Sequence, residues 1–380
     1  MMKKLLNICK SFFSAYKTLP AVIMLIMVLV PFVINFFNSN TTPLDNRPLR
    51  PKPTEFSGDF SKHYEDYYND AFAYRKSILK RYVKLQKKLK IDTGRHFSGL
   101  DGWMFYDSAK VSDGSTIVDY KGEVNYTDAE MEKMLKGVIM ARDFYAKRGI
   151  KYMLVIAPNK ENVYSEFMPM SLQRVRKSDK SRADVVAEYI AKNSDVPVLN
   201  LKDVVIASKD NFPIPVYFKT DTHWNAIGAY LGYEDIAKQL NKMGIKAPIK
   251  KLTNDMIYQE GKISTDMDIS SYEKAFKVKY LPNVNSEELL YEDQGKIIVY
   301  KADNAPVKKT VLMIRDSFAA DLIPFVSRVF RSSVFIHRSD KVHSNVEGYL
   351  EEYNPDVVID EVIERRVDKL VNYIENYRRK

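Results

Sequence analysis

The sequence predicts an α/β fold in which a mostly parallel sheet is covered by helices on both faces. Short apolar segments alternate with longer amphipathic segments from about residue 127 onward, as in strands linked by helices. The 380 residues, 45% of them hydrophobic, are enough for one large domain of this class with appendages. The only cysteine is Cys9, so stability has to come from a buried core and not from disulfides.

The N-terminal region predicts a membrane anchor over residues 19–37. This stretch is apolar and uncharged, and at about 1.5 Å per residue it is long enough for a bilayer core of about 30 Å. Four lysines precede it, whereas the first charge after it is Asp45, which places residues 1–18 in the cytoplasm and the rest of the chain outside. No small-residue cleavage pattern follows, so we expect an uncleaved anchor.

Residues 38–62 predict an extracytoplasmic linker, because they are rich in Pro, Asn and Thr. The catalytic domain is expected to span residues 63–380. From His63 to Lys90, apolar residues recur at helical spacing and predict one long amphipathic helix. Its second half carries many basic residues and no acid, which fits a solvated face or a face turned toward the membrane surface.

The remaining elements follow in order along the chain. Residues 99–106 predict a turn entering a short strand, and the capping-box pair Thr127 and Glu130 opens a helix that Gly149 ends. Later strands are expected at 151–156, 196–199, 308–314, 333–336 and 356–359, with helices at about 225–243 and 318–325. Residues 251–301 are polar and rich in turn residues, and predict an insertion of loops or a small hairpin near the site.

Two motifs point to a split Ser-His-Asp site. Ser317 is expected where a buried strand turns into a helix, a position that presents nucleophiles in α/β hydrolytic enzymes. A serine hydroxyl needs an imidazole to take its proton and a carboxylate to orient that imidazole, which His223 and Asp221 supply. Taken singly, each residue also fits a packing or helix-capping role.

The composition argues against metal and nucleic-acid chemistry. The five histidines show no metal-ligand spacing and the part after the anchor has no cysteine, so we expect no metal and no other cofactor. The net charge of +10 is spread along the chain and is not set among stacking aromatics, so nucleic acid is not an expected partner.

A set of ordered motifs resembles the SGNH hydrolase-like proteins of the alginate O-acetyltransferase AlgJ/AlgX type, most closely the DHHW group. The resemblance covers nearly the whole exported part. Two positions depart from the family pattern, since Arg315 replaces the glycine of Gly-Asp-Ser and Thr222 replaces the first histidine of Asp-His-His-Trp. The matching segments are 69–75, 102–105, 157–160, 163–164, 168–169, 221–225, 316–318 and 354–359.

The resemblance implies an SGNH-like three-layer fold with a circularly permuted motif order, in which Asp221 and His223 precede Ser317. It assigns Ser317 as nucleophile, His223 as general base and Asp221 as the partner that orients His223. Asn159 and Lys160 follow a predicted strand at the sheet edge where ligands bind, and are expected to hold substrate. Further oxyanion or substrate-binding candidates are Arg315 and Trp224.

The resemblance further implies an extracytoplasmic O-acyltransferase, with acetyl as the expected group and a cell-surface or exported polysaccharide as acceptor. A membrane-bound O-acyltransferase is the implied partner that delivers acyl groups across the membrane. Two alternatives remain open at this point. One is a carbohydrate acetylesterase with the same triad, and the other is a non-catalytic scaffold that binds glycan.

Overall fold

In the computed structural model, the chain divides into two compact units, Met1–Leu85 and Gln86–Lys380. The predicted cytoplasmic residues 1–18, most of the predicted anchor 19–37 and much of the linker lie outside the described residues. No helix among the described residues is long and apolar enough to cross a membrane, so the anchor stays a prediction. The structure describes residues 22–26, 29–30, 33, 49–54, 56, 58–72, 74–88, 94–268, 272–279, 288–293, 297–338 and 345–378.

The long helix predicted from His63 to Lys90 is in fact two helices. These are α3 (Phe60–Ala71) and α4 (Arg75–Lys88). Phe72 leaves α3 with an extended backbone, and Tyr74 has a φ of 58°, in the left-handed region. A left-handed residue cannot continue a right-handed helix, so the two helices are separate. The apolar periodicity was read correctly, but it carries no sign of this break.

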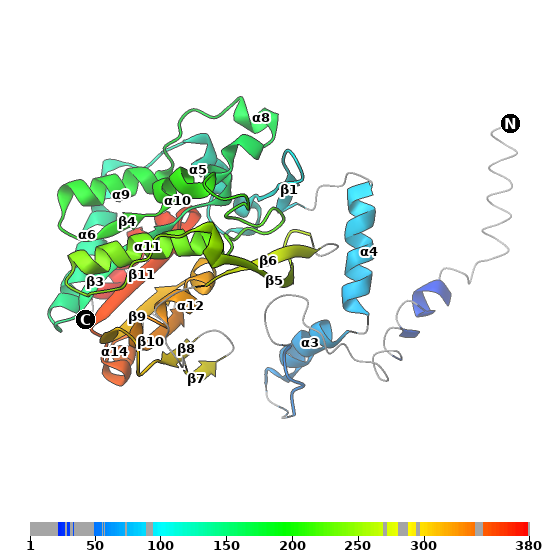
Figure 1. Ribbon diagram of the computed structural model, residues 1–380. Coiled ribbons are helices and arrows are strands. Elements are labelled where there is room, and N and C mark those ends of the chain that lie inside the picture. Colours follow the sequence, from blue (N-terminus) through cyan, green and yellow to red (C-terminus); the bar gives the residue numbers. More distant parts are fainter. Residues whose placement is uncertain are drawn as a thin grey trace, which may run out of the picture. The chain divides into compact units, whose positions relative to one another are not determined.

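A seven-stranded sheet forms the centre of the second unit (Figure 1). Its order is β4-β3-β11-β9-β10-β8-β7; the first five strands are parallel to their neighbours, and β8 and β7 are antiparallel at one edge. The predicted mostly parallel sheet is confirmed. The strands are β3 (Lys151–Ala157), β4 (Val198–Asn200), β7 (Glu288–Asp293), β8 (Ile297–Lys301), β9 (Val307–Arg315), β10 (Phe330–His337) and β11 (Val357–Ile363).

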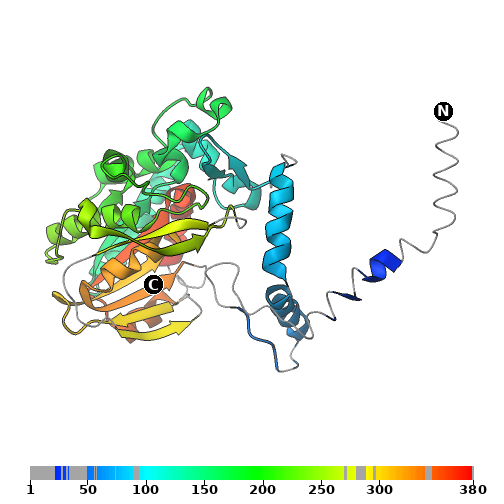
Figure 2. The same cartoon turned by 45° about the vertical axis from the view of Figure 1, so that its right-hand side comes forward.

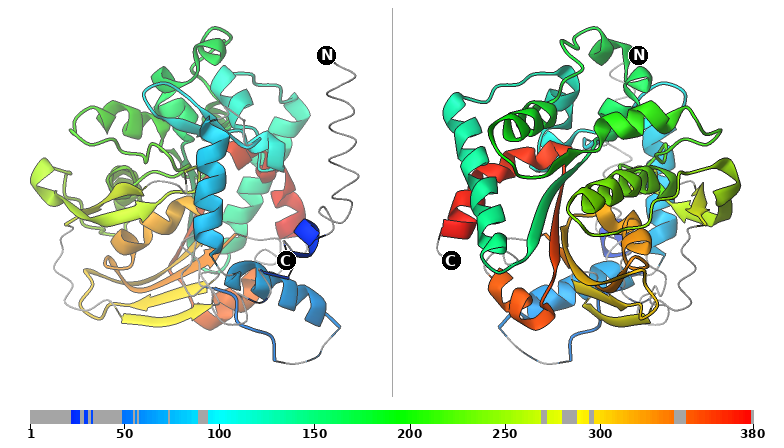
Figure 3. Two further views of the ribbon diagram at one scale, coloured as in Figure 1. Left: turned by 90° about the vertical axis from the view of Figure 1, so that its right-hand side faces the viewer. Right: turned by 60° about the vertical axis from the view of Figure 1, so that its left-hand side comes forward.

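Helices cover both faces of this sheet, as predicted. Alternate residues of β3 enter different cores: Met153 and Val155 pack on one side, and Leu154 and Ile156 on the other. Figures 2 and 3 show the sheet between its helical layers. The first core takes in α10 (Lys202–Lys209), α11 (Ala226–Lys242) and α12 (Ile323–Val326); the second takes in α6 (Asp128–Ala146), α9 (Arg182–Asn193), α14 (Val346–Tyr353) and α15 (Tyr373–Arg378).

Residues 251–301 are only partly an insertion. Strands β5 (Ile257–Ser264) and β6 (Tyr272–Val278) make the predicted small hairpin. By contrast, β7 and β8 pair with β10 and belong to the main sheet, which the polar composition of the segment concealed. A second hairpin, β1 (His96–Ser98) with β2 (Met104–Tyr106), confirms the predicted turn and short strand.

The structure confirms the predicted ends of one helix and corrects the helix predicted at residues 318–325. Thr127 and Glu130 form the capping box of α6, and Gly149 has the left-handed φ of 72° expected after the helix. The predicted helix 318–325 is a 3₁₀ turn, η4 (Phe318–Asp321), followed by the short α12. Pro324 has no N–H to donate and therefore fits the first turn of a helix, which is where it lies in α12 (Ile323–Val326).

Short segments complete the unit. They are η1 (Ser108–Val111), α5 (Thr116–Lys121), α7 (Lys160–Val163), η2 (Ser165–Phe167), α8 (Met170–Gln173), η3 (Asn254–Met256) and η5 (Glu364–Asn372).

Candidate active site

Residues 216–225 form a narrow loop that carries two of the predicted site residues; we call it the Asp-His loop. Tyr217 and Trp224 pair as an antiparallel bridge, and the N–H of Asn225 donates to the carbonyl of Val216 over 3.0 Å. The Asn225 side chain then accepts from the N–H groups of Ile227 and Gly228 and caps α11. His223 is therefore held just before the N-terminus of the long, buried helix α11 (Ala226–Lys242).

Ser317 lies at the turn that follows β9, next to strand β11. The carboxylate of Asp316 accepts from the N–H of Phe318 over 2.8 Å and from the N–H of Ile363 over 2.7 Å. Asp316 and Phe318 are buried, whereas Ser317 between them is exposed. The buried carboxylate thus fixes the turn and leaves the hydroxyl facing outward.

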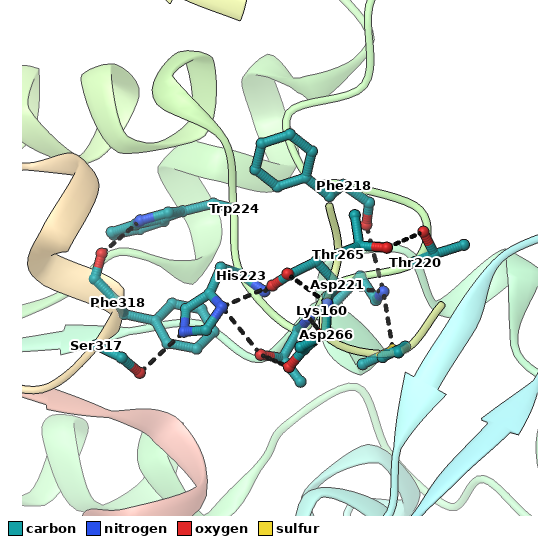
Figure 4. A network of polar contacts seen from close by, with 12 residues as sticks. Lys160, Phe218, Thr220, Asp221, His223, Trp224, Thr265, Asp266, Ser317 and Phe318 are labelled. Carbon is teal, nitrogen blue, oxygen red and sulfur yellow. Dashed lines mark hydrogen bonds and ion pairs between the residues drawn. The ribbon is translucent and has the colours of Figure 1, made fainter. Parts of the chain in front are cut away.

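The structure brings the three predicted triad residues into one hydrogen-bonded series (Figure 4). Nδ1 of His223 lies 2.7 Å from Oδ1 of Asp221, and Nε2 lies 2.9 Å from Oγ of Ser317. The N–H of His223 also donates to Asp221 Oδ1 over 3.0 Å. Both ring contacts are within the range expected of an acid-base residue and its partners. The arrangement suits removal of a proton from the Ser317 hydroxyl.

The charges around the imidazole favour its protonated form. Burial opposes ionisation of Asp221, but its bonds to His223 outweigh this and lower its pKa to about 2. Burial likewise disfavours a charged His223, yet the hydrogen bond and charge of Asp221, with the charge of Asp266, leave its pKa above the ordinary 6.5. Asp221 is therefore ionised at neutral pH and can stabilise the imidazolium that forms when His223 takes a proton.

Two neighbouring residues, Asp266 and Thr222, were not predicted as part of the site. The N–H of Asp266 donates to Asp221 Oδ2 over 3.1 Å, and its carboxylate accepts from the N–H of Thr222 over 3.3 Å. Asp266 follows strand β5 of the small hairpin, so only the predicted closeness of that insertion hinted at it. Asp221, His223 and Asp266 offer ligand atoms within 4.8 Å of one another, but Asp221 and His223 are already bonded to each other.

Trp224 and Arg315 are both buried and both donate hydrogen bonds to carbonyls of the turn around Ser317. Trp224 is fully buried, and its indole N–H donates to the carbonyl of Phe318 over 2.8 Å, which ties the Asp-His loop to the nucleophile turn. Arg315 is buried as the last residue of β9, and its guanidinium donates to the carbonyl of Asp316 over 3.2 Å. The substrate or oxyanion role expected of both side chains stays a prediction.

Asn159 and Lys160 do follow β3 at the carboxyl edge of the sheet, but both are buried. The N–H of Asn159 donates to the Glu364 carboxylate over 2.6 Å. The Lys160 ammonium donates to carbonyl groups inside the Asp-His loop, among them that of Asp221 over 2.6 Å. Their predicted contact with substrate also stays a prediction.

Comparison with known proteins agrees with the fold and the motifs. Residues 97–282 match the family model described as "SGNH hydrolase-like domain, acetyltransferase AlgX". This range contains Asp221 and His223, while Ser317 lies beyond it. No match was found among curated protein sequences.

Several solved structures resemble the chain. Bacillus cereus PatB1 with a sulfonyl adduct is 17% identical with a TM-score of 0.51, and the match covers 72% of this chain and 98% of PatB1. A DHHW family protein from Eubacterium siraeum is 12% identical with a TM-score of 0.50, and the match covers 75% of this chain and 96% of that protein. The O-acetyltransferase domain of Pseudomonas putida AlgJ is 15% identical with a TM-score of 0.46, covering 73% and 98%. At these identities, the two matches with TM-scores of 0.51 and 0.50 show a likeness of fold alone.

Proposed function

We propose that the protein is an O-acyltransferase that acetylates hydroxyl groups of a polysaccharide, because residues 97–282 match the family model of the SGNH hydrolase-like domain of acetyltransferase AlgX. The observation that carries this proposal is the series Asp221, His223 and Ser317, in which each contact is at hydrogen-bonding distance. Ser317 is exposed, His223 is half-buried and Asp221 is buried, so a substrate can reach the serine hydroxyl.

In the first half-reaction, Ser317 takes the acyl group. Oγ attacks the carbonyl carbon of an acyl ester or thioester while Nε2 of His223 accepts the hydroxyl proton. The bond from the carbonyl carbon to the leaving oxygen or sulfur then breaks, and the imidazolium returns its proton to that leaving group. An acyl-serine and a neutral imidazole remain.

The tetrahedral intermediate needs N–H donors for its oxyanion. The N–H of Phe318 is bonded to Asp316 and faces the support of the turn. The N–H of Ser317, next to the attacking hydroxyl, is therefore the proposed donor. Arg315, which replaces the family glycine, lies two residues before Ser317. The N–H of Ser317 is therefore present whichever residue stands at position 315.

In the second half-reaction, a sugar hydroxyl takes the acyl group. Nε2 of His223 accepts the proton of that hydroxyl, whose oxygen attacks the acyl-serine. The ester bond to Ser317 breaks, and Oγ recovers its proton from the imidazolium. If water attacks in place of the sugar, the same residues release acetate, which is the esterase reaction.

We also propose where the reaction takes place. The apolar segment 19–37 would anchor the protein in the cell membrane with the catalytic domain on the outer side. Acetyl donors are made in the cytoplasm, so a membrane-bound O-acyltransferase would hand acetyl groups across the membrane to Ser317. The acceptor would be a polysaccharide being exported or assembled at the cell surface.

The test measures where the acetyl group goes. The full-length chain in detergent is incubated with a chromogenic acetyl ester and a panel of cell-surface oligosaccharides, and acetylated sugar and free acetate are quantified by mass spectrometry. We expect acetylated sugar from the wild type and none from Ser317→Ala. If the wild type releases free acetate and acetylates none of the oligosaccharides, the protein is an esterase. Equal behaviour of both proteins would favour a non-catalytic scaffold.

A further inference from the structure

Lys160 is a buried cation that the proposed reaction does not use. Its side chain is 1% exposed, and it begins the short helix α7 after β3. Its ammonium donates to the carbonyls of Phe218 over 3.3 Å, Lys219 over 3.1 Å and Asp221 over 2.6 Å. A fourth, longer contact joins the ammonium to the Met267 sulfur over 4.0 Å. The three carbonyls are thus the nearest partners of an ammonium that has three N–H donors.

The three carbonyls belong to the tip of the Asp-His loop, residues 218–222. Backbone N–H groups of this tip are also hydrogen-bonded, to a side chain of the small hairpin. The N–H groups of Lys219 and Thr220 donate to the Glu273 carboxylate of β6 over 2.9 and 2.6 Å. The Lys160 ammonium thus binds carbonyls of the tip, and the Glu273 carboxylate binds its N–H groups. Asp221 belongs to this tip, and His223 follows it directly.

The backbone carbonyl and the side-chain carboxylate of Asp221 have different partners. Lys160 binds the Asp221 carbonyl, while the Asp221 carboxylate bonds His223 and accepts the N–H of Asp266. Burial lowers the pKa of Lys160 to about 8, and nearby acids oppose this, so the ammonium is charged at neutral pH. A charged donor holds carbonyl groups more firmly than a neutral one.

We propose that Lys160 is a positioning residue of the active site: its ammonium fixes the tip of the Asp-His loop so that Asp221 holds His223 against Ser317. This inference rests on the proposed function, because it assigns the residue to the same reaction. It differs from the expectation that Lys160 binds substrate, because the ammonium is buried and its three nearest partners are carbonyls of the loop.

The test compares two buried lysines in the full-length chain in detergent. Lys160→Met keeps the length of the side chain and removes its charge and donors. Lys202→Met is the matched control, because Lys202 is also buried but its ammonium bonds the Asp179 carbonyl and the Asp184 carboxylate. The probe is phenylmethylsulfonyl fluoride, and the readout is its rate of addition to Ser317, followed by intact mass at a temperature where each variant is folded.

Loss of the loop support should slow the reaction of Ser317 itself. We expect Lys160→Met to be labelled at least about tenfold more slowly than wild type, because a displaced base no longer takes the serine proton. Turnover of an acetyl ester should lose kcat by a similar factor with KM little changed. Lys202→Met should lose thermal stability but keep the wild-type labelling rate.

Each result decides the proposal. A folded Lys160→Met protein that is labelled and turns over at the wild-type rate would overturn it, as would an equal slowing in Lys202→Met. If Lys160→Met does not fold, Lys160→Gln, which keeps an amide donor, takes its place: slower labelling supports the proposal and wild-type labelling overturns it. If wild-type Ser317 is never labelled or acetylated, the proposed function itself fails, and that outcome is visible before any variant is made.

Discussion

At the scale of single residues, the ionisation of His223 sets the pH dependence of the proposed reaction. The imidazole must be neutral to accept the serine proton, and its pKa lies above 6.5 because Asp221 and Asp266 outweigh the effect of burial. Activity should therefore rise with pH through a midpoint above 6.5, where His223 loses its proton. The charge of Arg365 lowers the pKa of His223, and Asp321 also interacts electrostatically with His223. The midpoint therefore reflects all of these charged residues.

Asp266→Asn tests the contribution of the second carboxylate. Removing its negative charge destabilises the imidazolium, so the midpoint of the kcat/KM profile should move to lower pH. The shift should be below about one unit, since Asp266 is exposed and solvent screens its charge. Asp255→Asn, an exposed acid at the start of the same hairpin segment, is the control and should leave the midpoint unchanged. A midpoint that stays in place or rises in Asp266→Asn contradicts this account of His223.

The closeness of Asp221, His223 and Ser317 could be predicted because each stands in a local pattern: a serine after a strand and an Asp-x-His motif before a helix. Asp266 and the loop contacts of Lys160 could not be predicted. The place of Asp266 depends on the hairpin β5–β6 lying against the Asp-His loop, and no periodicity in residues 251–301 predicts this. The contacts of Lys160 depend on the packing of that loop against the start of α7. The buried position of Trp224 and its bond to the Phe318 carbonyl likewise require the three-dimensional packing of two distant turns.

At the scale of elements, the Asp-His loop depends on the close approach of helix α11. A Cβ added at Gly228 would lie 2.4 Å from the carbonyl oxygen of Val216, at the base of this loop. Backbone atoms cannot move aside as a flexible side chain can, so the loop and helix have to separate. Gly228 is therefore needed for contact between the helix and the loop that carries His223.

Gly228→Ala should lower both stability and activity. We expect a loss of about 1–3 kcal/mol in the free energy of unfolding, typical of overpacking, and a lower kcat because the loop is displaced. Denaturant unfolding and ester turnover measure the two effects. Gly232→Ala is the control one turn later, where the added Cβ would meet the flexible end of Leu201 at 3.1 Å. Equal stability and turnover in Gly228→Ala and wild type would show that the close approach has no role.

Elements with strong patterns were predicted well, including β3, β9, β11, α6 and α11. The errors lie where backbone conformation or long-range pairing decides. Tyr74 separates α3 from α4, and Pro324 lies in the first turn of α12, which follows a 3₁₀ turn. Strand β8 joins the main sheet by pairing with β10, and β7 pairs with β8. None of these features changes local hydrophobicity, which is the signal on which the predictions relied.

At the scale of the whole molecule, the proposed topology separates the chain into a cytoplasmic end and an outer domain. The single cysteine makes this separation measurable, because Cys9 lies before the predicted anchor and no other thiol is present. Ser171 in α8 is exposed and provides a site for a second thiol in the outer domain.

A membrane-impermeant maleimide should distinguish the two ends in cells with an intact cytoplasmic membrane and an opened outer layer. Wild-type Cys9 should react only after the membrane is broken. In a Cys9→Ser background, Ser171→Cys should react without lysis, because the domain would face outward. Early labelling of Cys9, or protection of Ser171→Cys until lysis, contradicts the proposed orientation.

The most direct measurement is the intact mass of the full-length protein after brief exposure to a chromogenic acetyl ester. The account predicts that wild-type protein gains the mass of one acetyl group, located on Ser317 by peptide mapping, and that Ser317→Ala and His223→Ala gain none. A gain of acetyl that is equal in all three proteins, or that maps elsewhere in wild type, would contradict the assignment of Ser317 as nucleophile and His223 as its base.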